Sequence, residues 1–167
     1  MKAHKTSRAG QPASAQSRSG IAPSNRILLV DDDIDIRLLS ADLLFHSGYQ
    51  VDTAEDGESG WEALQTRNYN LLITDNKMPK VSGLELVKKL RSARMALPVI
   101  LASGAMPEEL NRMPSLQLAA TLWKPFTPDE LLGTVKRVLC ETDSALKQVE
   151  PRPIWRSQPS ADGLRLW

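Results

Sequence analysis

Short hydrophobic runs alternate with longer amphipathic segments through the central part of the chain. The runs at residues 27–30, 71–74 and 99–102 are continuously apolar, as expected for strands that are covered on both faces. Two less apolar runs, of five and six residues, also have the length of a strand. The pattern therefore predicts five strands, at residues 27–30, 50–54, 71–74, 99–102 and 118–123.

Segments with helical periodicity lie between these runs. Residues 34–46 carry a wide apolar stripe that stops before Gly48, and Thr127, Pro128 and Glu130 make a helix start in which the threonine hydroxyl and the glutamate cap each other. The predicted helices are residues 34–46, 57–66, a third from Leu84 through Leu90 after a turn-rich stretch at 75–83, a short one between Pro107 and Pro114, and a last one from Pro128 through Val138, with the pattern lapsing after Glu141. Such alternation predicts an α/β fold, a doubly wound five-stranded parallel sheet with helices on both faces.

Composition divides the chain into three parts. Residues 1–25 are rich in small, polar and basic residues and carry a charge of +4, which predicts a disordered basic tail. Residues 26–140 form the predicted domain, with 13 bases and 16 acids and thus a charge of −3. Residues 141–167 read as a C-terminal tail without a recognisable output domain, since a DNA-binding domain would need more chain and a basic recognition helix.

Charge and cysteine content narrow the classes of function. The net charge of +1 offers no general attraction to nucleic acid or to a membrane surface, and no apolar run is long enough to span a bilayer. Cys140 is the only cysteine, which excludes an internal disulfide and fits a reducing, cytoplasmic setting. The acid-free first 25 residues also weakly resemble an organellar transit peptide, which ranks below the disordered tail.

Polar residues suited to phosphoryl chemistry follow four of the predicted strands. Asp31 and Asp32 come directly after the first strand, Asp75 after the third, Ser103 after the fourth and Lys124 after the fifth. The carboxyl ends of parallel strands meet at one edge of a sheet, so these side chains should share one site. Acids that can hold a cation, with a hydroxyl and an ammonium that can contact an oxyanion, indicate phosphoryl transfer onto a carboxylate.

The same segments resemble a known family. The acidic cluster in residues 27–33 (ILLVDDD), the acceptor loop in 74–79 (TDNKMP), the hydroxyl segment in 101–104 (LASG) and the Lys-Pro-Phe element in 124–126 are similar to the motifs of the receiver domain of two-component response regulators. Each motif alone is weak, but the order and spacing match over about two-thirds of the chain. The resemblance implies a flavodoxin-like fold.

The resemblance also implies a role for each of these positions. Asp75 would be the phosphoacceptor, Ser103 the switch hydroxyl and Lys124 the phosphoryl contact. Mg²⁺ would be held by Asp31, Asp32, Asp75 and the backbone carbonyl of Lys77, because hard cations prefer oxygen ligands. The phosphoryl donor would be a sensor histidine kinase or a phosphotransfer protein, and the output would be contact with an unknown downstream protein rather than with DNA or a membrane.

Two features depart from the family pattern. The switch aromatic of receivers usually lies three residues before the lysine, and that position is Thr121 here. Trp123 has the same strand parity and is a candidate substitute, although packing alone explains it equally well. The short helix between Pro107 and Pro114 belongs to the usual output face, formed by the fourth helix, fifth strand and fifth helix, through which a homodimer is a further option.

Other functions remain open from the sequence. The domain could be a constitutive scaffold with an uncoupled switch, or a phosphatase with an aspartyl nucleophile, for which Asp31 and Asp33 have the right spacing. As a receiver it would be no enzyme beyond slow phosphorylation and dephosphorylation of itself. The spacing of acids in residues 31–42 does not fit an EF-hand, because Ile36 stands where that calcium loop requires glycine. A nucleotide-binding enzyme is also disfavoured, because no glycine-rich loop follows the first predicted strand.

Overall fold

The computed structural model describes residues 25–105 and 116–148. The helix predicted between Pro107 and Pro114 lies outside the described residues, as do residues 1–24 and 149–167 of the two predicted tails.

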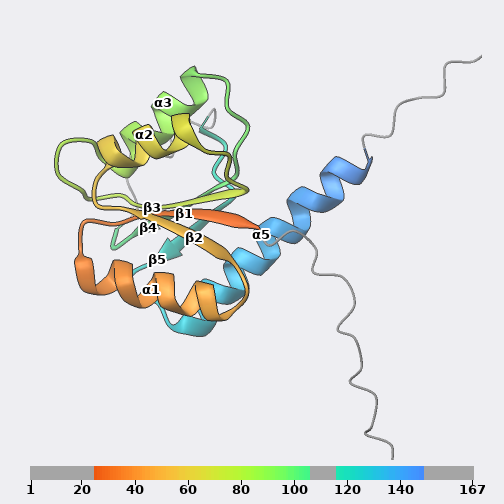
Figure 1. Ribbon diagram of the computed structural model, residues 1–167, viewed down its shortest axis with the longest axis horizontal. Helices are drawn as coiled ribbons and strands as arrows, with labels where there is room; N and C mark the ends of the chain where they lie inside the picture. The colour runs from red at the N-terminus through yellow and green to blue at the C-terminus, as the bar shows by residue number, and fades with distance from the viewer. Residues whose placement is uncertain (1–24, 106–115, 149–167) are drawn as a thin grey trace, which may run out of the picture.

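Five parallel strands form one sheet in the order β2-β1-β3-β4-β5 (Figure 1). The strands are β1 (Arg26–Val30), β2 (Gln50–Ala54), β3 (Leu71–Asp75), β4 (Val99–Ser103) and β5 (Ala120–Trp123). The predicted fold class is confirmed. The strand predicted at residues 118–123 begins two residues later, because Gln117 has a φ of 46° and turns the chain before it becomes extended.

Helices cover both faces of the sheet, with α2 and α3 on one side and α1 and α5 on the other (Figure 1). They are α1 (Ile34–His46), α2 (Gly57–Thr66), α3 (Gly83–Ser92) and α5 (Pro128–Gln148). Alternate residues of β1 supply the two cores: Ile27 packs with Leu44 and Val135, whereas Leu28 packs with residues of α2 and α3. The strands are therefore buried on both faces, which explains their unbroken hydrophobic runs.

The helix ends follow their sequence signals. The Asp33 carboxylate accepts hydrogen bonds from the backbone N–H of Asp35 (2.9 Å) and Ile36 (3.2 Å), and so caps α1. Gly48 follows α1 with a φ of 93°, a conformation that glycine adopts without strain. At the start of α5, Thr127 N–H donates to Glu130 Oε2 and Glu130 N–H donates to Thr127 Oγ1, as predicted.

The last helix is longer than its apolar pattern predicted. The pattern lapses after Glu141, but α5 runs to Gln148 and projects beyond the sheet (Figure 1). Its buried face ends at Leu139, so hydrophobic periodicity could report only that part. Beyond it, two side-chain hydroxyls bond back to the preceding turn of the helix: Thr142 Oγ1 donates to Val138 O and Ser144 Oγ donates to Cys140 O.

Candidate functional site

The carboxyl ends of four strands surround one pocket of about 340 Å³. Asp31 follows β1, Asp75 ends β3, Ser103 ends β4 and Lys124 follows β5. All six residues predicted from the sequence line the pocket, together with three that were not predicted: the lining is Asp31, Asp32, Asp33, Ile36, Asp75, Lys77, Ser103, Gly104 and Lys124. The strand order alone brings these distant residues together.

The Lys124 ammonium lies between two carboxylates. Its Nζ is 2.8 Å from Asp31 Oδ2 and 2.6 Å from Asp75 Oδ1. Burial disfavours the charged lysine, but the hydrogen bonds and charges of Asp31 and Asp75 outweigh burial and raise the pKa of Lys124. The group therefore stays a cation, which is what contact with a phosphoryl oxygen requires. The peptide bond between Lys124 and Pro125 is cis.

The two carboxylates differ in their surroundings. Burial raises the pKa of Asp31, and hydrogen bonds from Lys124 and from the backbone N–H of Asp33 oppose this effect only in part. Asp75 is 6% exposed, and its Oδ2 accepts a hydrogen bond of 2.6 Å from the backbone N–H of Lys77. Asp32 is exposed at the rim of the pocket. Asp75 is thus buried in the pocket and bonded to the loop that follows it.

The Ser103 hydroxyl is turned toward its own loop. Ser103 is buried, and its Oγ donates a hydrogen bond of 2.5 Å to the Ala105 carbonyl. Of the two candidate switch residues on β5, Thr121 is half-buried and Trp123 is 46% exposed. The tryptophan therefore has one side in solvent in this structure.

The donor chemistry of the pocket fits Mg²⁺. Asp31, Asp32 and Asp75 offer carboxylate oxygens, and Lys77 at the pocket wall offers a backbone carbonyl, all of them hard ligands. Within residues 25–105 and 116–148, no three His, Cys, Asp or Glu side chains already stand as a metal-binding group. Lys124 is the cation that Asp31 and Asp75 contact here.

The sequence did not reveal an ion pair beside the loop that follows Asp75. Lys80 Nζ lies 2.5 Å from Asp56 Oδ2, and Asp56 is buried at the N-terminus of α2. An aspartate directly before a helix is a capping signal, but the ion-pair partner of Asp56 is 24 positions away along the chain. No local pattern connects the two residues.

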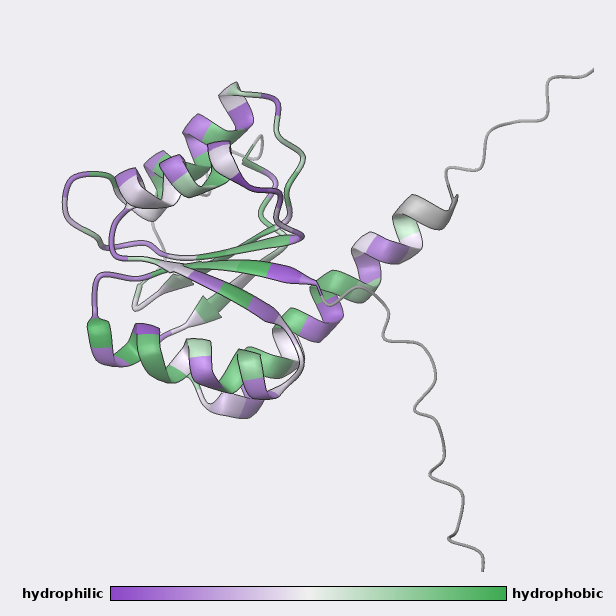
Figure 2. Ribbon diagram, viewed as in Figure 1, coloured by the Kyte–Doolittle hydropathy of each residue, from purple (hydrophilic) through white to green (hydrophobic). Residues whose placement is uncertain are grey.

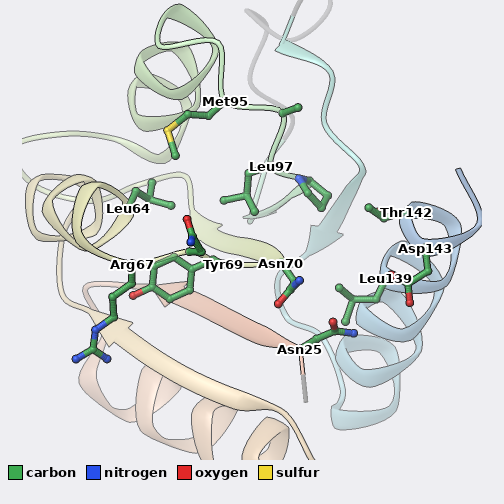
Figure 3. Close-up of a pocket in the computed structure, with 13 residues that line it drawn as sticks. Asn25, Leu64, Arg67, Tyr69, Asn70, Met95, Leu97, Leu139, Thr142 and Asp143 are labelled. Atoms are coloured by element: carbon green, nitrogen blue, oxygen red, sulfur yellow. The ribbon is translucent and has the colours of Figure 1, made fainter. Parts of the chain in front are cut away.

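A second pocket, of about 380 Å³, lies at the opposite edge of the sheet (Figure 3). Leu64, Tyr69 and Leu97 line it together with the start of β1 and the later part of α5. Burial, followed by a hydrogen bond to Asp52, raises the pKa of Tyr69 to about 12, so this phenol stays protonated. None of the predicted site residues lies here; all of them line the strand-end pocket.

Comparison with known proteins places the chain in a family. The family model for the response regulator receiver domain matches residues 27–136. The chain therefore belongs to the receiver domain family of two-component response regulators, as its motifs predicted. No helix in the described part of the chain is long and apolar enough to cross a membrane.

Individual relatives agree with this assignment. The alkaline phosphatase synthesis transcriptional regulatory protein PhoP of Bacillus subtilis is 34% identical over 76% of this chain and 53% of its own length, so the chain spans about half of that relative. The chemotaxis protein CheY4 of Vibrio cholerae has a TM-score of 0.64 with 31% identity, covering 69% of this chain and 98% of its own. TrrA of Thermotoga maritima, solved with Mg²⁺ and BeF, has a TM-score of 0.61 with 35% identity, covering 68% and 98%.

Proposed function

We propose that this protein is a cytoplasmic phosphoacceptor in which Asp75 receives a phosphoryl group from a histidine kinase or a phosphotransfer protein, with Mg²⁺. The contact that supports this most directly is that of Lys124 Nζ with Asp75 Oδ1 at 2.6 Å, within a pocket that also holds Asp31. In the reaction, a carboxylate oxygen of Asp75 forms a bond to phosphorus while the bond from phosphorus to the donor nitrogen breaks. The product is an acyl phosphate that alters contacts with a downstream protein.

Each residue has a part in this proposal. Lys124 would neutralise charge on the transferred group, and Ser103 would donate to it after turning away from Ala105. Asp31, Asp32, Asp75 and the Lys77 carbonyl would hold Mg²⁺, which when bound reduces the repulsion between the carboxylate and the phosphoryl group.

Intact-mass measurement tests the assignment of Asp75. We expect the protein to gain one phosphate when incubated with Mg²⁺ and acetyl phosphate, and the Asp75→Asn variant to gain none, because the amide is not a nucleophile. An adduct that survives in the variant would reject Asp75 as the acceptor. Steady hydrolysis of a phosphoester without any adduct would instead favour the phosphatase.

Tryptophan fluorescence recorded in parallel tests Trp123 as the switch aromatic. An unchanged fluorescence signal on phosphorylation rejects that role.

The outer surface of α1 supports a protein as the donor. This helix is apolar on both sides, and its solvent-facing side is visible in Figure 2. Four large side chains there are between 58% and 72% exposed: Ile34, Leu38, Leu39 and Phe45. Leu39 also lines a groove with Pro125 and Phe126, and Ile36 lines both this groove and the strand-end pocket. Exposed apolar patches of this kind commonly mark protein-interaction surfaces. A protein donor that reaches Asp75 would cover this one.

Leu39→Asp should reveal the donor surface. We expect transfer from a phosphorylated donor protein to fall by about tenfold or more, because a buried apolar contact would become an unpaired charge. Phosphorylation by acetyl phosphate should be unchanged, since the side chain is 72% exposed and does not line the strand-end pocket. Gln65→Asp, exposed on α2, is the matched control. Equal loss with both phosphodonors would place the defect in the pocket rather than in docking.

A constitutive scaffold is the second candidate function. Two observations favour it: the Ser103 hydroxyl is bonded to Ala105, and Thr121 has no ring that could move inward. In that case Asp75 would accept phosphate without any change in partner binding. The proposed homodimer through the fourth helix, β5 and α5 involves residues outside the described part of the chain.

A further inference from the structure

The loop that follows Asp75 contains one residue in an unfavourable conformation. Lys80 has a φ of 63°, in the left-handed region that residues with a side chain rarely adopt. Around it, the Val81 N–H donates a hydrogen bond of 2.8 Å to the Pro79 carbonyl, closing a three-residue turn. Such a conformation persists only where the surrounding structure holds it.

The side chain of Lys80 provides that hold. Its Nζ contacts Asp56 Oδ2 at 2.5 Å, and Asp56 is only 4% exposed. The other carboxylate oxygen of Asp56 accepts from the Ser59 N–H (2.8 Å) and hydroxyl (2.9 Å). The hydrogen bond from Lys80, followed by those from Ser59, holds the pKa of Asp56 well below its usual range, so the pair stays ionised at neutral pH. A rigid carboxylate at the start of α2 thus anchors the loop.

Close backbone contacts fix the rest of the loop. A Cβ added to Gly57 would lie 2.4 Å from the Val81 carbonyl oxygen, so α2 and the loop meet without a side chain between them. At the other end, Asn76 N–H donates to the Ala102 carbonyl on β4 (2.9 Å). Lys77 lies between these two attachments, and its N–H binds Asp75 directly. The position of Lys77 therefore depends on both ends of the loop.

We propose that Lys80 and Asp56 are positioning residues for phosphorylation at Asp75. Their ion pair holds the loop so that the Lys77 backbone stays at the wall of the strand-end pocket, where its carbonyl would bind Mg²⁺. This inference rests on the proposed phosphoacceptor function and adds two residues to it, neither of which lines the pocket. Residues that do not bind a metal themselves but hold its ligands in place commonly change metal affinity by about 10- to 100-fold when they are replaced.

Two single variants remove the ion pair between Lys80 and Asp56 while leaving the rest of the fold in place. Lys80→Met removes the cation, and Asp56→Asn removes the charge while its amide oxygen can still cap α2. We expect each to weaken Mg²⁺ binding, measured by isothermal titration calorimetry, by about tenfold. The rate of adduct formation with acetyl phosphate at low Mg²⁺ should fall to a similar extent. The Val81 amide should exchange faster with solvent by NMR in the absence of metal, because its turn is no longer held.

Rescue and coupling complete the test. Lys80→Arg should keep the Mg²⁺ affinity of the parent, because arginine can still pair with Asp56. The double variant Lys80→Met with Asp56→Asn should bind Mg²⁺ no more weakly than either single variant, since each single substitution already removes the same ion pair. Lys136→Met, exposed on α5, controls for the loss of one positive charge. Unchanged Mg²⁺ affinity and amide exchange in Lys80→Met, or additive losses in the double variant, would overturn the proposal. If the parent forms no adduct, the phosphoacceptor function fails, whereas calorimetry and exchange still decide the positioning role.

Discussion

Replacing Lys124 with methionine is expected to slow phosphorylation of Asp75 by roughly a hundred- to a thousandfold, the usual effect of removing a preorganised group that stabilises transition-state charge. Lys124 Nζ is already 2.6 Å from Asp75 Oδ1, so little rearrangement is needed before it contacts the incoming group. Methionine keeps a similar length and apolar volume but carries no charge. The loss should therefore appear in the rate of adduct formation.

Time-resolved intact mass with acetyl phosphate and saturating Mg²⁺ measures this effect, with Lys136→Met as the control for total charge. Thermal unfolding gives a second readout. Burial already raises the pKa of Asp31, and without Lys124 that pKa should rise further. A raised carboxyl pKa favours the folded state at low pH and loses this contribution as pH rises through the folded value. The variant should thus gain stability on acidification relative to the parent. A phosphorylation rate equal to that of the parent would contradict the role of Lys124.

Gly83→Ala is expected to destabilise the fold strongly, by about 3 kcal/mol, because the new methyl group has no space. An added Cβ would lie 2.0 Å from the Asp75 carbonyl oxygen and 3.0 Å from Thr74 Oγ1. Both belong to the buried end of β3, which cannot move without displacing Asp75 from the pocket. We therefore expect slower phosphorylation in whatever fraction still folds.

Gly133→Ala is the matched control for this substitution. Gly133 lies within α5, and a Cβ there would meet nothing within 4 Å. Alanine is the better helix former by about 1 kcal/mol, so this variant should be more stable than the parent. Urea unfolding of both variants, with midpoints compared at equal slope, measures the difference. Similar midpoints for the two would show that the contact between Gly83 and Asp75 is easily relieved.

The helices illustrate how far a hydrophobic pattern can be interpreted. Residues 34–46 were predicted as a helix from their apolar stripe, and α1 has those bounds. The pattern did not say which side faces the sheet, because this helix is apolar nearly all round: Leu44 is buried, while Leu38 and Phe45 are exposed. The choice depends on which side chains meet β1 and α5, and that contact is not local in sequence.

The ends of elements show the same division. Asp33 and Gly48 mark the ends of α1 through contacts with their own neighbours, so their roles could be predicted. The end of α5 at Gln148 lies beyond its buried face, where no apolar periodicity remains to be followed. The orientation of the Ser103 hydroxyl toward Ala105 is a loop geometry that the strand pattern does not determine.

The sequence by itself determined the family, the five-stranded parallel sheet and the gathering of Asp31, Asp75, Ser103 and Lys124 at one edge. It could do so because unbroken apolar runs predict buried parallel strands, and parallel strands end at the same edge. Only the tertiary structure decided which charges meet. Lys124 contacts carboxylates at the ends of two other strands, and Lys80 contacts a residue 24 positions earlier, because such pairs depend on how separate elements are placed and where their side chains point.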